Sequence, residues 1–349
     1  MLVQDLLHYL TARFLFLDEA VKGYEHLHEL FVGRSHSNKA IAVETSESPT
    51  ILTVPSLPKR QLVWMITGTS TGFGRRLVKS ALLRGDLVIA TVRRLEKTDQ
   101  SDQDDIPVGL QANLRRIELD VTEGEDALKA KVDKAAVTWG RIDVLVNNAG
   151  QGLVGLSEEG GSSLFRKAFD VNVFGLVDMT TVTLPYLRRS QGCVVNIGSR
   201  SAWKTELLGV GPYSASKAAV HALSETLATE LAPFNVKVLL VAPGAFRTEG
   251  IHSRPFFQER PVPAYDDVRD ITARRFASIP GTQKGDPARA MEIVVDIVRG
   301  EGSAVGKPWP SHLVLGQDAI ADVRAKARKL EEAVDEWEWT GRAVSYEWS

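Results

Sequence analysis

Apolar residues gather in short runs of Val, Ile and Leu beyond residue 60, and longer segments with apolar residues at helical spacing separate these runs. This alternation predicts a parallel sheet covered by helices on both faces. The run "VKVLLVAP" is apolar at successive positions, which is typical of a strand buried on both sides. We therefore expect a doubly wound α/β fold, with strands near residues 62–67, 87–92, 115–119, 143–147, 193–197, 236–242 and 312–315.

A long stretch over residues 245–285 has no clear core element and contains several prolines. In an open α/β sheet, an insertion that follows the carboxyl end of a strand lies over the ligand crevice. We therefore predict that this stretch forms a lid over a substrate.

Two further segments precede the expected sheet. Over residues 1–33, apolar residues recur at alternating steps of four and three, which predicts an apolar stripe along one helix or a pair of helices. Packing of this helical extension on the rest of the chain is favoured, ahead of a contact with a second copy or attachment to a membrane surface. Residues 34–60 are rich in Ser, Thr, Pro and Asn, so we expect a linker to a domain over residues 61–349.

Composition and charge mainly exclude functions. The formal net charge of -2 gives no broad basic surface for nucleic acid, and no apolar stretch approaches the ~20 residues needed to span a membrane. The single cysteine cannot form an internal disulfide, and the acidic residues near the N-terminus do not fit a targeting signal. We expect a cytoplasmic protein with no nucleic-acid partner, no integral membrane segment and no metal site.

The first candidate for chemistry is the turn "TGTSTGFG" between the first expected strand and a helix, which holds Gly68, Gly72 and Gly74. Here the backbone can approach a pyrophosphate closely, and the helix N-terminus offers free N–H groups and a favourable dipole. The larger gap between glycines comes first, unlike the usual dinucleotide fingerprint. Three glycines in a turn are a weak signal by themselves and also fit a purely structural turn.

The second candidate is the pair Tyr213 and Lys217, which lie four positions apart at the start of an expected helix. Side chains at this spacing project from one face of a helix. A nearby ammonium favours the phenolate of tyrosine, and a tyrosine with a lowered pKa can exchange a proton with an alcohol or ketone. Taken alone, such a pair would usually just line a helix surface.

Five motifs occur together along the chain: "TGTSTGFG", "NNAG" at 147–150, "DVNVFG" at 170–175, "NIGS" at 196–199 and "YSASK" at 213–217. In their order and approximate spacing, they make the chain over roughly residues 61–316 resemble the short-chain dehydrogenase/reductase family. The resemblance implies a Rossmann-type sheet over 61–349 that binds a nicotinamide dinucleotide.

The resemblance also implies roles for four side chains. Tyr213 is expected to be the general acid/base, and Lys217 to lower the pKa of that tyrosine and to bind the nicotinamide ribose. Ser199 is expected to polarise the substrate oxygen, and Asn172 to hold a proton-relay water. Asn172 also fits a polar core position satisfied by backbone groups.

The active serine has two candidates. Ser199 precedes Tyr213 by 14 positions, one more than the resemblance leads us to expect, whereas Ser201 precedes it by 12. An insertion after Ser199 would leave this residue at the carboxyl end of a strand, where sheets of this type place their ligands. We therefore favour Ser199 over Ser201.

Contacts to the cofactor also follow from the resemblance. Besides Tyr213 and Lys217, the expected contacts are Gly68, Ser70, Thr71, Gly72, Phe73, Gly74, Asp120, Asn147, Ala149, Gly150, Pro243, Gly244 and Thr248. Asn147 fits a buried core role equally well. Arg93 and Arg94 stand at the end of the second expected strand, where an NAD-binding fold usually has an acid. Because a cation suits the 2′-phosphate, we expect NADP(H), with NAD as the alternative.

Together these residues predict reversible hydride transfer between NADP(H) and a secondary alcohol or ketone, in the direction of reduction if NADPH is the cofactor. Aromatic residues in the lid, and Trp203, favour a partly apolar substrate. The alternatives are a non-catalytic NADP-binding regulatory or scaffold protein, and an NAD-dependent alcohol dehydrogenase of the same family. The segment "PARAMEIVVDIVRG" and a long helical segment from residue 318 could supply the contact face of a homo-oligomer.

Overall fold

The computed structural model describes residues 60–95, 106–249 and 255–346. Contacts along the chain divide it into two units, Met1–Leu52 and Thr53–Ser349, and all described residues belong to the second unit. The helical extension predicted over residues 1–33 lies outside the described residues, and so does the linker predicted over 34–60 apart from Arg60.

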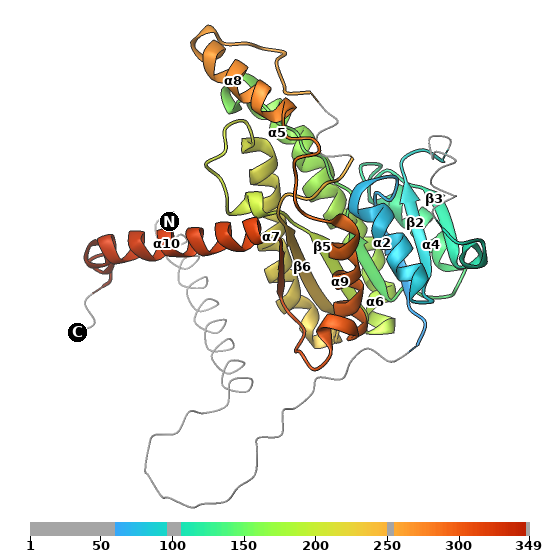
Figure 1. Ribbon diagram of the computed structural model, residues 1–349. Helices are drawn as coiled ribbons and strands as arrows, with labels where there is room; N and C mark the ends of the chain where they lie inside the picture. Colours follow the sequence, from blue (N-terminus) through green and yellow to red (C-terminus); the bar gives the residue numbers. More distant parts are fainter. Residues whose placement is uncertain (1–59, 96–105, 250–254, 347–349) are drawn as a thin grey trace, which may run out of the picture. The chain divides into compact units, whose positions relative to one another are not determined.

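A parallel sheet of seven strands forms the centre of the second unit (Figure 1). The strands follow the order β3-β2-β1-β4-β5-β6-β7, so the sheet extends from β1 in both directions. They are β1 (Val63–Ile66), β2 (Leu87–Val92), β3 (Leu114–Glu118), β4 (Val144–Asn147), β5 (Cys193–Ile197), β6 (Lys237–Pro243) and β7 (His312–Leu315). The doubly wound α/β fold is confirmed, and each strand begins and ends within one residue of its predicted limits.

Helices cover both faces of this sheet. On one face lie α2 (Gly72–Leu83) and α9 (Pro287–Arg299), which share a core with the strands. On the other face lie α4 (Glu125–Ala136), α6 (Gly175–Ser190) and α7 (Gly211–Leu231). The layers can be followed in Figure 1.

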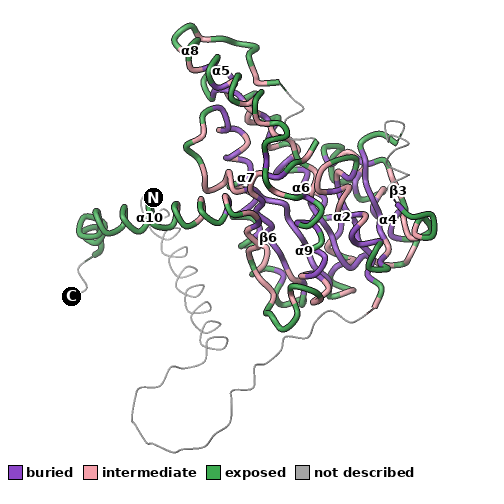
Figure 2. Tube along the Cα trace, in the orientation of Figure 1, coloured by how far each residue is buried: buried purple, intermediate pink, exposed green. Residues whose placement is uncertain are grey.

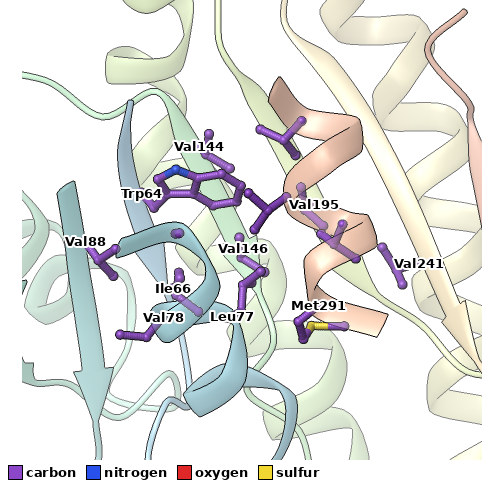
Figure 3. Packing of buried hydrophobic residues seen from close by; sticks show 14 of the residues in the cluster. Trp64, Ile66, Leu77, Val78, Val88, Val144, Val146, Val195, Val241 and Met291 are labelled. Atoms are coloured by element: carbon purple, nitrogen blue, oxygen red, sulfur yellow. The ribbon is translucent and has the colours of Figure 1, made fainter. Parts of the chain in front are cut away.

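Strand β1 shows how each central strand serves both cores. Trp64 and Ile66 point into the core formed with α2 and α9, whereas Val63 and Met65 belong to the core on the opposite face. Figure 3 shows the first of these cores, with Trp64 among Val144, Val146 and Val195 of the neighbouring strands. All four residues of β1 are at most 1% exposed, so the strand has no polar face, which is typical of a central parallel strand.

Helix α9 contributes its apolar face to the core. It begins at Asp286, whose side chain accepts the N–H groups of Ala288 and Arg289, with Pro287 at the first helical position. Its apolar residues, Met291 and Val295 among them, are buried against α2 and the sheet. The apolar face of the segment "PARAMEIVVDIVRG" is thus buried within the fold, and its use in a homo-oligomer stays a prediction.

The remaining elements are shorter or lie outside the two layers. The short turns are η2 (Val108–Asn113), η3 (Asp170–Phe174), η4 (Arg200–Ala202), η5 (Ala232–Phe234), η6 (Pro263–Tyr265) and η7 (Gly302–Ala304). The other helices are α5 (Ser157–Phe169), α8 (Asp266–Ala277) and α10 (Gln317–Arg342). Among the described helices, none combines the length and the apolar character needed to cross a membrane.

Helix α8 lies within the stretch 245–285, which was expected to contain no clear core element. It has few apolar residues and therefore little apolar periodicity, and its buried residues are the polar Arg269 and Thr272. Arg269 of α8 instead forms a buried ion pair with Glu159 of α5, and the two helices lie side by side in Figure 1. The Phe256 ring lies 5.9 Å from that of Phe276 in α8, so this aromatic side chain packs within the fold.

Candidate active site

The side chains assigned to chemistry meet at the carboxyl edge of the sheet. Ser199 follows β5 by two residues, and Tyr213 and Lys217 occupy the first turns of α7. Asn172 lies in η3, a π-helical turn between α5 and α6. Ligands of open α/β sheets bind at this edge, so the structure brings together residues that are far apart in the chain.

Ser199 and Tyr213 share a hydrogen bond between their side chains. Ser199 is buried, and its hydroxyl also accepts the backbone N–H of Ser201 at 3.1 Å. Ser201 lies in the short η4 turn and is only partly buried. Of the two candidate serines, Ser199 is therefore the one in contact with the tyrosine.

The pKa of Tyr213 differs from the expectation. Burial raises the pKa of Tyr213 above its ordinary value, and the hydrogen bond with Ser199 offsets only part of that rise. The sequence predicted that Lys217 would lower this pKa, but the Lys217 ammonium donates to the carbonyl of Ile197 at 2.7 Å and lies 6.0 Å from the centre of the tyrosine ring. Loss of solvent therefore dominates the pKa of Tyr213.

Lys217 is itself buried and only 5% exposed. Burial lowers the pKa of the Lys217 ammonium to about 8, because the charged form loses its hydration. Near neutral pH most of the Lys217 side chain therefore remains in the charged form, and the Ile197 carbonyl holds it in place.

The side chain of Asn172 is fully engaged within the fold. Its oxygen accepts the N–H of Gln151 at 2.7 Å, and its nitrogen donates to the Gln151 carbonyl and to the Ser216 hydroxyl. A Cβ atom on Gly150 would lie 3.3 Å from the Asn172 oxygen and 3.6 Å from the Lys217 nitrogen. Asn172 thus fixes the chain after β4 next to Lys217, and a relay water at this residue would have to use its backbone.

The glycine turn after β1 has little room for side chains. Gly68 has φ +66, and a Cβ atom there would lie 2.8 Å from the Cα of Ala149. A Cβ atom on Gly74 would lie 2.4 Å from the carbonyl oxygen of Gly68. Asn148 links this turn to β4 by donating to the carbonyls of Thr67 and Gly68, both at 2.8 Å. The turn therefore needs glycine at both positions.

A carboxylate that the sequence reasoning missed lies at this turn. Glu249 accepts the backbone N–H of Gly72 at 2.9 Å, and Arg76 donates to both of its oxygens. These hydrogen bonds, chiefly that from Arg76, lower the pKa of Glu249 to about 2. Thr248, an expected cofactor contact, lies beside Gly72. The N-terminus of α2 thus already binds an anionic group, the Glu249 carboxylate.

The other predicted cofactor contacts occupy separate positions around this edge. Ser70 and Thr71 are exposed at the glycine turn, and the Phe73 ring packs on Phe246 at 5.4 Å. Arg93 and Arg94 are exposed at the end of β2. Asp120 follows β3, where its carboxylate accepts the N–H and hydroxyl of Thr122. Pro243 is the last residue of β6, and Gly244 follows it.

Asn147 lies in the core beneath the edge, where only 4% of it is exposed. Its amide nitrogen donates to Thr180 and to Asn196, each at 2.9 Å. The side chain therefore joins β4 to α6 and β5, which is the core role left open for this residue. Ala149 and Gly150, which follow it, lie nearer the surface.

His221 is a second residue that the sequence reasoning missed. It lies one turn after Lys217 on α7, and its Nε2 accepts the backbone N–H of Ser199 at 3.3 Å. Burial lowers the pKa of His221 to about 4, with a smaller effect from Lys217, so the ring is neutral near pH 7. Its spacing of four from Lys217 was a signal for the shared helix face.

Comparisons with known proteins agree with this architecture. A family model described as short chain dehydrogenase matches residues 62–255. The chain belongs to the short-chain dehydrogenase family. A solved short-chain dehydrogenase from Streptomyces avermitilis is 34% identical with a TM-score of 0.70, covering 82% of this chain and 100% of that one. The protein is thus an NAD(P)-dependent oxidoreductase with a Rossmann-type fold.

Two further members of the family have names that bear on chemistry. Human 11-beta-hydroxysteroid dehydrogenase type 2 is 34% identical over 206 residues, which are 58% of this chain and 50% of that protein. A serine dehydrogenase solved in complex with NADP+ is 27% identical with a TM-score of 0.57, covering 73% of this chain and 94% of that one.

Proposed function

We propose that this short-chain dehydrogenase interconverts a ketone and a secondary alcohol with NADP(H), and that Tyr213 moves the proton. The observation that carries the proposal is the hydrogen bond between Ser199 and Tyr213 at the carboxyl edge of the sheet. Because the hydroxyls of Ser199 and Tyr213 are hydrogen-bonded to each other, both can reach the same substrate oxygen. A buried ammonium, that of Lys217, lies one helical turn from the tyrosine.

The glycine turn fits the cofactor that the family uses. Glycine at positions 68 and 74 lets the turn pack closely against Ala149 and Asn148, and the N–H of Gly72 already binds an anionic group, the Glu249 carboxylate. Gly68, Gly72 and Gly74 would hold the pyrophosphate, and Lys217 the ribose next to the nicotinamide. When bound, the nicotinamide supplies or accepts the hydride.

The residues around Tyr213 provide the proton chemistry. Ser199 would donate to the substrate oxygen, which fixes that oxygen beside the Tyr213 hydroxyl. Because burial raises the pKa of Tyr213, the hydroxyl stays protonated at neutral pH and can donate as negative charge develops on the oxygen. Oxidation needs the phenolate, which the raised pKa makes scarce, so this arrangement favours reduction of a ketone.

The preference for NADPH rests on Arg93 and Arg94, which follow β2 at a place where an NAD-binding fold usually has an acidic residue. A charge-assisted hydrogen bond to the 2′-phosphate corresponds to roughly 10- to 150-fold in affinity. Fluorescence titration should show tighter binding of NADPH than of NADH. Replacing both arginines by alanine should remove the difference and leave NADH binding unchanged. Equal or tighter NADH binding by the parent protein would overturn the preference.

The substrate that we propose is a ketone or secondary alcohol with an apolar body. Support comes from the similarity to a hydroxysteroid dehydrogenase, and from Trp203, whose ring packs on His221 next to Ser199. A panel of ketones that differ only in apolar size, assayed by the absorbance of the reduced nicotinamide, tests this. We expect kcat/KM to rise with apolar size, and activity restricted to small polar ketones would contradict the proposal.

A further inference from the structure

Helix α10 leaves the body of the fold after its first turns. Ala319 is buried, and Arg200 pairs with Asp318 at 3.1 Å and with Asp322 at 2.8 Å. From Ala327 to Arg342 every residue is exposed, as the green trace of this helix in Figure 2 shows. At 1.5 Å per residue, this part of the helix is about 24 Å long. The described part of the chain therefore leaves most of α10 uncovered.

The apolar residues of α10 repeat as a heptad. They follow alternating steps of three and four at Ile320, Val323, Ala327, Leu330, Val334 and Trp337. Such a repeat makes a narrow apolar seam, which is typical of two helices paired in a coiled coil. Leu330, Val334 and Trp337 are 54%, 63% and 62% exposed, so the seam is open to solvent within the described residues.

Charge is unevenly distributed along α10: apart from Asp318 and Asp322, which pair with Arg200, and Arg342 at its end, the basic residues lie in the first half and the acidic residues in the second. The basic residues of the first half are Arg324, Lys326, Arg328 and Lys329, and the acidic residues of the second half are Glu331, Glu332, Asp335, Glu336 and Glu338. If two copies of α10 lie antiparallel, the basic half of each meets the acidic half of the other. Parallel copies would place like halves side by side, so the charge pattern selects the antiparallel pair.

We propose that the seam of α10 is covered by α10 of a second copy of this chain, in an antiparallel two-helix coiled coil. A two-fold axis that sets Leu330 level with Val334 of the partner subunit also sets the small Ala327 against the large Trp337 of the partner subunit. The same register brings Arg324, at the edge of the seam, next to Glu338 of the partner subunit. Apolar size is thus self-complementary, and charge is self-complementary at the two ends of the paired segment, while Glu331 lies near its own copy at the two-fold axis.

The first test removes the seam from the full-length chain. Sedimentation velocity should show that Leu330→Glu with Val334→Glu halves the mass of the largest assembly. Trp339→Glu is the matched control, because Trp339 is 86% exposed and lies outside the heptad positions. The control should sediment like the parent protein. If the variant with Leu330→Glu and Val334→Glu also sediments like the parent protein, the proposal is wrong.

The second test uses charge reversal at surface positions, where folding is not at risk. Arg324→Glu and Glu338→Arg should each weaken the association, with a rise of roughly fivefold or more in the dissociation constant, since each acts twice in a two-fold pair. The double variant Arg324→Glu/Glu338→Arg should restore the parent value. A double variant as weak as the single ones would exclude the antiparallel register, because only that register pairs these two positions.

Discussion

The Glu249 carboxylate accepts the backbone N–H of Gly72 at 2.9 Å, although the two residues are 177 positions apart in the chain. Arg76, one turn along α2, holds the same carboxylate with bonds of 3.0 and 2.6 Å. The free N–H groups of a helix N-terminus are the groups that bind a dinucleotide phosphate. We therefore expect Glu249 and the cofactor phosphate to compete for the N–H of Gly72.

We predict that Glu249→Gln tightens NADPH binding by about 5- to 30-fold. The reason is that a phosphate no longer has to displace a charge-assisted bond of about 1–2 kcal/mol, a range reduced for solvent exposure. Because the pKa of Glu249 is about 2, the effect should be the same at every pH at which the parent protein is stable. Fluorescence titration measures it directly.

Glu292→Gln serves as the control for this change. Glu292 is an exposed carboxylate on α9, and its replacement changes the net charge equally. Its affinity for NADPH should match that of the parent protein. If Glu249→Gln binds NADPH no better than this control, then the carboxylate does not compete with the cofactor.

The position of Glu249 also marks a limit of sequence reasoning. The runs of apolar residues locate the seven strands because strand burial is a local property that each run records. The contact between residues 72 and 249 depends on how β6 and α2 are placed in space, and no local pattern records that. Similarly, the π-helical turn around Asn172 has no apolar signature, and the pKa of Tyr213 depends on burial by distant segments.

We predict that Tyr213→Phe lowers kcat by ~10²–10⁴-fold while the affinity for NADPH is nearly unchanged. The change removes one hydroxyl and little volume, so the loss reports on proton transfer. Tyr186→Phe on α6 removes a remote hydroxyl, which bonds to Asp133, and should keep parent activity. A Tyr213→Phe enzyme with more than about a tenth of parental kcat, measured with chemistry rate-limiting, would remove Tyr213 from the proposed mechanism.

The lowered pKa of Lys217 predicts how stability depends on pH. Its pKa is about 8 in the folded state and 10.5 as the ordinary value, so between these pH values the unfolded chain binds more protons. Folding is therefore penalised below pH 8, and the penalty disappears as the pH rises towards 10.5. We expect Lys217→Met to gain in Tm relative to the parent at pH 7 by more than at pH 10. A difference in Tm independent of pH would contradict this.

We predict that Ser199→Ala lowers kcat by on the order of 10²-fold, whereas Ser201→Ala has little effect. Ser199 is buried at a strand end and touches Tyr213, while Ser201 contributes its backbone N–H and keeps it after the substitution. Both variants would be assayed with one ketone at saturating NADPH, after their melting temperatures are compared. The reverse order of effects would show that the second serine polarises the substrate.

His221 holds the backbone of Ser199. Its Nε2 accepts the Ser199 N–H at 3.3 Å, and the Trp203 ring packs on the imidazole at 4.5 Å between ring centres. Since the residue does not touch Tyr213 in this network, we interpret it as a positioning residue for Ser199. A Cβ atom on the adjacent Gly198 would lie 2.4 Å from the same Nε2, so the histidine fits tightly under the strand end.

We predict that His221→Phe lowers kcat more than His221→Gln does. Phenylalanine removes the acceptor and leaves the buried Ser199 N–H without a partner, which costs ~1–3 kcal/mol. We expect kcat to fall by about tenfold with the affinity for NADPH unchanged, because the glycine turn is remote from this contact. Glutamine keeps a side-chain acceptor and should restore a substantial part of kcat. Equal loss in both variants would mean that the ring is needed only for packing.

Melting temperatures measured over a range of pH separate the role of His221 as a hydrogen-bond acceptor from its role in packing. The pKa of His221 is about 4 in the folded state and 6.5 as the ordinary value, so the unfolded chain binds the extra proton between these pH values. The parent should therefore lose stability as the pH falls from 6.5 towards 4, and His221→Gln should lose less because it cannot be protonated. If both proteins show the same fall in Tm over this range, the imidazole is not held neutral beneath Ser199, and the positioning role has no basis.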